Sequence, residues 1–190
     1  MSKLAKALTA AAGNAGGDNL YVEDVFSTYL YEGNAGTQTI TNGIDLAGEG
    51  GLVWTKNRDS ASWDNGLTDT ERGLGKTLMS NLTAQETLAS DIYAFNSDGF
   101  DLGYATGFGN AIGSNASWTF RKAEKFFDVV TYTGDGTNGR SITHNLGVTP
   151  AFMVVKKTSA TAEWAIWHQS VNGGDSYGLF TTAAFNTTAA

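Results

Sequence analysis

The chain has 190 residues, of which 41% are hydrophobic and 16% charged, with a formal net charge of −7 at pH 7 and no cysteine. This composition excludes a disordered chain, disulfides, thiolate zinc sites and cysteine nucleophiles. The negative charge repels phosphates and anionic lipids, and no apolar run approaches the roughly 20 residues that span a bilayer, so we expect neither nucleic-acid binding nor membrane insertion.

The first 24 residues are expected to form a docking arm. Small residues at positions 10–12 and 16–17 cannot build an independent core, and residues 3–12 are the only stretch with helical character. We expect this arm to be extended or partly helical and to order on a partner. Its candidate docking residues are Leu4, Leu8, Asn14, Leu20 and Tyr21.

Short apolar segments between glycine-rich turns predict an all-β protein. The chain has 24 glycines and one proline, and 12% of its residues are aromatic. Residues 96–99 predict a hairpin, because Asp98 and Gly99 suit the positive φ angles of tight turns. Residues 117–121 alternate, which places Trp118 and Phe120 on one face. The strands expected in the first part of the chain cover residues 25–30, 38–41, 52–56, 77–81, 92–96, 100–102 and 117–121.

The chain contains an internal repeat. The blocks that begin at Tyr31, Leu52 and Trp63 recur 101 positions later, and six collinear blocks match in all. The matched pairs are residues 24–25 with 128–129, 31–34 with 132–135, 39–42 with 141–144, 52–56 with 153–157, 63 with 164, and 80–84 with 185–189.

The repeat predicts two tandem β-sandwiches of jelly-roll-like type, at residues 25–125 and 126–190. The second copy contains no counterpart of residues 92–100 and 117–121, and a sandwich without these strands has unpaired edges. We therefore expect the chain to be a fragment of a longer polypeptide or to be completed by a partner's strands. The strands expected in the second copy are residues 127–132, 141–143, 152–157, 163–168 and 177–181.

Carboxylates are the only candidates for acid–base chemistry. They sit in turn-rich stretches where aspartate normally caps turns, so we expect a protein that is not an enzyme and has no cofactor or metal. Two histidines, His144 and His168, cannot build a zinc site by themselves. A polysaccharide-degrading enzyme remains the alternative interpretation of these carboxylates, which are Asp64, Asp69, Glu71, Asp98 and Asp101.

The tryptophans have two interpretations, as core residues or as a sugar-stacking platform. Aromatic side chains dominate the packing of small β domains, so we expect most of them in the core. Trp167 follows Trp164 by three positions, so the two point to opposite faces of a strand and one of them is exposed. The candidate glycan contacts are Trp167 and Tyr177.

Three stretches, residues 20–33, 117–134 and 142–150, resemble repeat proteins of marine bacteriophages, including those of cyanophages. These proteins are described as tail-fibre-like or virion structural proteins with a concanavalin-like sandwich character. The resemblance implies a location in the virion, other tail or capsid proteins as partners, and self-association, for example as a trimer. It favours a tail-fibre or appendage subunit whose repeats act as spacer and bind host-surface glycans. A capsid-attached decoration protein and a carbohydrate-binding module are the alternatives.

Overall fold

The computed structural model describes residues 20–104, 107, 109–171, 176–180 and 188–189, the last two ranges by their backbone alone. It is all-β, as the composition predicts. Within these residues the helices are single turns, α2 (Val22–Val25) and α3 (Leu46–Glu49). The strands are β1 (Phe26–Gly33), β2 (Gln38–Thr41), β3 (Gly51–Asn57), β4 (Gly66–Asp69), β5 (Leu78–Met79), β6 (Ile92–Asn96), β7 (Gly99–Leu102), β8 (Gly113–Arg121), β9 (Phe152–Lys156), β10 (Trp164–His168), β11 (Ser176–Phe180) and β12 (Thr188–Ala189).

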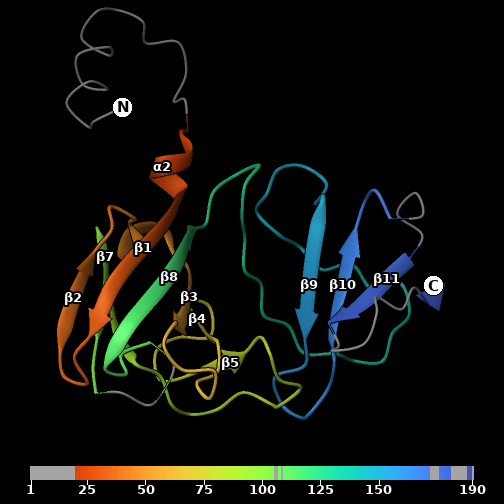
Figure 1. Cartoon of the computed structure of the whole chain (residues 1–190). Coiled ribbons are helices and arrows are strands. Elements are labelled where there is room, and N and C mark those ends of the chain that lie inside the picture. The colour runs from red at the N-terminus through yellow and green to blue at the C-terminus, as the bar shows by residue number, and fades with distance from the viewer. Residues whose placement is uncertain (1–19, 105–106, 108, 172–175, 181–187, 190) are drawn as a thin grey trace, which may run out of the picture.

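The described strands form antiparallel sheets (Figure 1). One sheet has the order β1-β8-β3-β4-β5, a second has the order β2-β7-β6, and a third has the order β12-β11-β10-β9. The first two sheets use strands from residues 26–121, whereas the third uses only strands after residue 151. A long irregular segment connects β8 to β9 and separates the two groups of strands.

The main core lies between the first two sheets. Phe100 on β7 and Val53 on β3 are fully buried, and Ile40 on β2 packs with them. Ile44 and Leu46, in the loop and turn before β3, complete this cluster with Ile92 and Leu102. Residues 26–121 therefore form two packed layers around one hydrophobic core, which is a sandwich arrangement.

The inner face of β3 and β8 is more polar than the sequence predicts. Thr55 pairs with Ser117 and Asn57 with Asn115, and all four side chains are buried. The Asn57 side-chain amide donates a hydrogen bond to the side-chain oxygen Oδ1 of Asn115 at 3.2 Å. Small polar side chains thus fill much of the space between the sheets, which leaves little room there for large rings.

The tryptophans are accordingly not core residues, with one exception. Trp54 and Trp118 lie on the outer face of the first sheet, with ring centroids 5.7 Å apart, and Trp63 is exposed. Only Trp164, on β10, is buried. The expectation that most tryptophans occupy the core is therefore wrong, because the strand alternation that buries Thr and Asn turns the rings outward.

Most expected strands before residue 122 are present, and the hairpin at residues 96–99 is confirmed. Asn96 pairs with Gly99 across this turn. The alternation in β8 is also confirmed, since Trp118 and Phe120 are half-buried and Thr119 between them is buried. The sequence did not predict β4 or α3, which have short glycine-containing sequences without a clear period.

The predictions of strands at residues 127–132 and 141–143, in the second copy, are wrong. Both segments are irregular, and Tyr132, which matches Tyr31 of β1, is exposed. In the first part of the chain, β1 pairs only with β8 and β2 pairs only with β7. No described strand after residue 121 takes the place of β7 or β8, so the matching segments have no ladder to join.

Gly33 at the end of β1 gives a test of this difference. A Cβ atom at Gly33 would lie 1.9 Å from the Ala111 carbonyl oxygen, whereas a Cβ at the matching Gly134 would meet nothing within 4 Å. We expect Gly33→Ala to lower the free energy of unfolding by about 1–3 kcal/mol, because the backbone must shift. Gly134→Ala is the matched control and should change it by less than about 0.5 kcal/mol. Urea denaturation measures both free energies of unfolding. Equal losses in the two variants would contradict the conclusion that Gly33 is closely packed and Gly134 is not.

Residues 82–87 join the two groups of strands, and we call them the bridging segment. On the side of the third sheet, the Trp164 indole N–H donates to the Leu82 carbonyl at 2.9 Å, and Lys156 Nζ donates to the Thr83 carbonyl at 3.0 Å. On the other side, Thr87 forms a β-bridge with Thr77. The third sheet is therefore linked to the sandwich through a short irregular segment.

Candidate functional site

The third sheet carries the candidate glycan contacts. Trp164 and Ile166 on β10 are buried, whereas Ala165 and Trp167 are half-buried. This alternation places Trp164 and Trp167 on opposite faces of the sheet, as their spacing predicts. Trp167 is thus the more accessible of the two rings.

The strand register brings the two glycan candidates together. Trp167 is directly opposite Tyr177 on β11 and opposite Met153 on β9. Met153 and Val155 are 42% and 43% exposed. We call Met153, Val155, Ala165 and Trp167 the Trp167 shelf. It is a partly exposed apolar surface with an aromatic ring, which is the kind of surface on which the apolar face of a sugar ring stacks.

The two histidines have local structural roles. His144 Nδ1 accepts a hydrogen bond from the Leu146 amide at 3.2 Å, and His168 Nδ1 accepts one from the Ser170 amide at 3.1 Å. The His168 ring also lies 6.2 Å from the ring of Phe152. Across the described part of the chain, no group of three or more His, Cys, Asp or Glu residues is arranged to hold a metal ion.

The carboxylates that the sequence marks for acid–base chemistry mostly have structural partners. Asp64 accepts from the Asn81 side chain at 2.7 Å, and Asp101 accepts from the Asn96 side chain at 2.9 Å. Glu71 forms an ion pair with Lys122, and this hydrogen bond is the main cause of the raised pKa of Lys122. Asp64, Asp101 and Glu71 are therefore each engaged by a neighbouring side chain.

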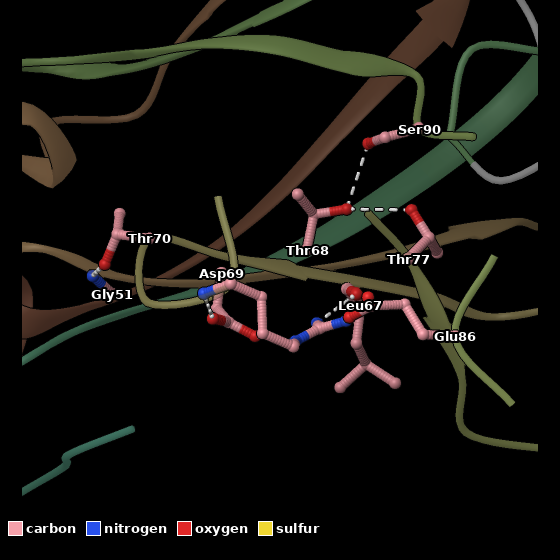
Figure 2. A network of polar contacts seen from close by, with 9 residues as sticks. Gly51, Leu67, Thr68, Asp69, Thr70, Thr77, Glu86 and Ser90 are labelled. Atoms are coloured by element: carbon pink, nitrogen blue, oxygen red, sulfur yellow. Dashed lines mark hydrogen bonds and ion pairs between the residues drawn. The ribbon is translucent and has the colours of Figure 1, made fainter. Parts of the chain in front are cut away.

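Asp69 belongs to a buried network around Arg72, and Figure 2 labels the three partners of this arginine, Asp69, Leu67 and Glu86. Arg72 Nε lies 2.6 Å from Asp69 Oδ2 and Arg72 Nη1 lies 3.0 Å from Glu86 Oε2. Arg72 Nη2 donates to the Leu67 carbonyl at 2.8 Å. The Arg72 side chain is only 7% exposed, so this network links β4 to the bridging segment in a largely water-free position. The sequence did not identify it.

A second buried carboxylate, Asp91, holds the loop after β7. Its Oδ2 accepts from the amides of Gly109 and Asn110 at 2.6 and 2.8 Å. The Tyr31 hydroxyl donates to the Gly109 carbonyl. Burial, and to a smaller degree the Asp91 carboxylate, raise the pKa of Tyr31 above its usual range. No sequence motif marks Asp91. The one signal in the sequence is the glycine-rich loop after β7, where backbone amides need an acceptor.

A shallow hollow of about 240 Å³ lies in the loop around residues 132–142. Asp135 and Arg140 line it, and their charged atoms are 3.3 Å apart. The Thr137 amide donates to Asp135 and is the main cause of the lowered pKa of that carboxyl group. The charged groups of Asp135 and Arg140 thus interact with each other and with the backbone of the same loop.

Of the candidate docking residues, Leu4, Leu8 and Asn14 lie outside the described residues. Leu20 is 46% exposed, and the Tyr21 amide donates to the Asp24 carboxylate at 3.1 Å just before α2. The side chain of Tyr177 is also outside the described part of the structure. The docking role of the residues in the arm and the glycan contact of Tyr177 remain predictions.

In the described residues, no helix is long and apolar enough to cross a membrane. No curated protein and no solved structure matches the chain. A family model described as a domain of unknown function (DUF7483) matches residues 22–190, which include every described strand of the three sheets. The chain therefore belongs to the DUF7483 family.

Proposed function

We propose that this chain is a non-enzymatic structural subunit of a bacteriophage particle, a tail fibre or related appendage, built from tandem β repeats with an N-terminal docking arm. The resemblance of residues 20–33, 117–134 and 142–150 to marine phage repeat proteins supports the virion location. The carboxylates engaged in turns and ion pairs favour a structural role. A capsid-attached decoration protein is the nearest variant of this proposal.

The observation that carries the proposal is a recurring strand order. β9, β10 and β11 are consecutive antiparallel neighbours in the third sheet, as β3, β4 and β5 are in the first. A lysine near the end of the first strand of each set binds the loop that follows: Lys56 Nζ donates to the Trp63 carbonyl, and Lys156 Nζ donates to the Ala162 carbonyl. A duplicated unit explains both similarities.

These two lysines indicate a different offset between the two copies of the repeat at β3 and β9. They are 100 positions apart, one fewer than the offset at Tyr31 and Tyr132. The Gly50 carbonyl accepts a hydrogen bond from the amide of Lys122, the residue after β8. The Gly51 carbonyl accepts one from the amide of Thr70, the residue after β4. The Ala151 carbonyl accepts a hydrogen bond from the amide of Gln169, the residue after β10. Ala151 is therefore equivalent to Gly51, whose carbonyl bonds to the residue after the next strand in the same way. An offset of 100 gives β3 and β9 the same side-chain orientation, whereas an offset of 101 reverses it.

Deletion of residues 1–18 tests the virion role. We expect the truncated protein to keep its β-sheet circular dichroism and unfolding midpoint but to be missing from particles, because the arm supplies the contact with the particle. Mass spectrometry and immunogold labelling of purified particles measure incorporation, with the full chain as control. Truncated protein recovered on particles would contradict the docking arm, and a full chain absent from particles would contradict the proposal itself.

A carbohydrate-binding role is the second candidate, and the Trp167 shelf favours it. If the repeats bind host-surface glycans, Trp167→Ala should weaken binding by about 30-fold or more, since truncation of a binding hot spot costs about 2 kcal/mol. Trp63→Ala is the control, because Trp63 is 41% exposed but lies in the first repeat, outside the Trp167 shelf. A glycan array followed by titration measures both variants. Equal binding by both would remove Trp167 from the site.

A further inference from the structure

We infer that the free edge of β9 is an acceptor site for an antiparallel β-strand with the sequence pattern of β8, presented by a separate polypeptide. This inference rests on the tandem-repeat part of the proposed function. In the first sheet, β3 lies between β4 and β8. In the third sheet, β9 has β10 on one side, and no described strand lies on the other. The acceptor edge is thus the position that β8 takes beside β3.

The hydrogen-bond pattern shows which groups of β9 face this edge. The Gln169 amide donates to the Ala151 carbonyl at 3.0 Å, so Ala151 and Gln169 are a hydrogen-bonded pair of the β9–β10 ladder. Such pairs alternate with wide pairs, so the backbone groups of Met153 and Val155 also point to β10. Those of Phe152, Val154 and Lys156 point to the free edge. β9 therefore presents a row of backbone donors and acceptors there.

The side chains of β9 are exposed in a way that the side chains of β3 are not. In β3, residues alternate between buried and half-buried. In β9, the four consecutive residues Phe152, Met153, Val154 and Val155 are 54%, 42%, 42% and 43% exposed. An exposed apolar edge strand is a template for pairing with another chain. Exposure on both faces of the strand indicates that a neighbouring strand is missing.

The register of the first sheet indicates how the donor strand would lie. β8 places Phe120 opposite Leu52 and Trp118 opposite Trp54. With the offset of 100, the donor residues equivalent to Phe120 and Trp118 would lie opposite Phe152 and Val154. Aromatic residues opposite aromatic or β-branched residues are favourable cross-strand pairs. Strand addition of this kind derives affinity from the backbone and specificity from alternate side chains.

A synthetic peptide with the sequence of residues 113–121, followed by two lysines for solubility, tests the site. Fluorescence anisotropy with the labelled peptide should show saturable 1:1 binding to the 190-residue chain. Amide hydrogen exchange should slow at Phe152, Val154 and Lys156 on binding. The amides of Met153 and Val155 should already be slow in the free protein, because they bond to β10.

Two variants of one position separate backbone pairing from apolar contact. Val154→Pro removes a donor from the free edge and should weaken peptide binding about tenfold or more. Val154→Ala keeps that donor and should bind within about threefold of the parent chain. Unchanged exchange of β10 amides in Val154→Pro shows that this variant is folded, and the exchange pattern of the parent chain tests the site independently of either variant.

Several results would overturn the inference: no saturable binding of the peptide, equal binding of a scrambled peptide, or no added protection at Phe152, Val154 and Lys156. A dimer of the chain that forms without peptide and is lost in Val154→Pro would assign the edge to a second copy instead. Binding by a chain that is absent from particles would refute only the virion role. A chain found on particles that binds no peptide would refute only this inference.

Discussion

Arg72→Met is expected to lower the free energy of unfolding by about 3–5 kcal/mol, the usual cost of removing one partner of a buried ion pair. The change leaves Asp69 and Glu86 without their shared counter-charge, and the Asp69 side chain is only 4% exposed. It also leaves the Leu67 carbonyl without the donor at 2.8 Å. Urea denaturation followed by circular dichroism measures the loss.

Arg140→Met is the matched control for this prediction. Arg140 also forms an ion pair, with Asp135 at 3.3 Å, but the two side chains are 38% and 53% exposed. Exposed pairs contribute little to stability because water screens them. Arg72→Lys, which keeps the charge but not the planar fork, should fall between the two. Similar losses in Arg72→Met and Arg140→Met would show that burial of the network does not matter.

Trp164→Ala is expected to destabilise the third sheet by about 3–5 kcal/mol, the range for truncating a large buried aromatic side chain. Trp164 is 6% exposed, and its indole N–H donates to the Leu82 carbonyl of the bridging segment at 2.9 Å. The change removes packing and this link together. Amides of β9 and β10 should exchange faster in the variant, while those of β3 and β8 should keep their protection.

Trp167→Ala serves as the control for Trp164→Ala, since it removes the same side chain from the opposite face of the same strand. Trp167 is half-buried, so we expect less than half of the effect on β9 and β10. If Trp164→Ala also unprotected β3 and β8, the two groups of strands would unfold as one unit, and the bridging segment would be part of a single cooperative core rather than a joint.

The sequence predicted elements that depend on local pattern. The hairpin at residues 96–99, the alternation in β8 and the opposite faces of Trp164 and Trp167 are expected from turn residues or spacing, and each is present. Of the two residues expected to take a positive φ in the hairpin, Gly99 does and Asp98 does not. The strands expected at residues 127–132 and 141–143 have the same local pattern as β1 and β2 but no partner strands. A β-strand needs a neighbour to bond, and that neighbour is not encoded in the strand itself.

The polar networks could not be predicted for a similar reason. Asp69 and Asp91 are in sequences that resemble ordinary turns. Glu86, which shares Arg72 with Asp69, is 14 positions from Arg72, and Asn110, whose amide donates to Asp91, is 19 positions from Asp91. Spacing of this length has no fixed geometry until the sheets have formed. The outward orientation of Trp54 and Trp118 was missed because aromatic content predicts burial, whereas the strand alternation decides which face each residue takes.

The position of the bridging segment bears on the order of folding during synthesis. All strands of the sandwich lie before residue 122, so its two sheets can close while β9 and β10 are still being made. Leu82 and Trp164 are 82 positions apart, and their contact forms only after that long loop closes. The third sheet would then assemble on a sandwich that is already folded, and a ribosome stalled once residue 121 has left its exit tunnel should already carry a protease-resistant N-terminal fragment.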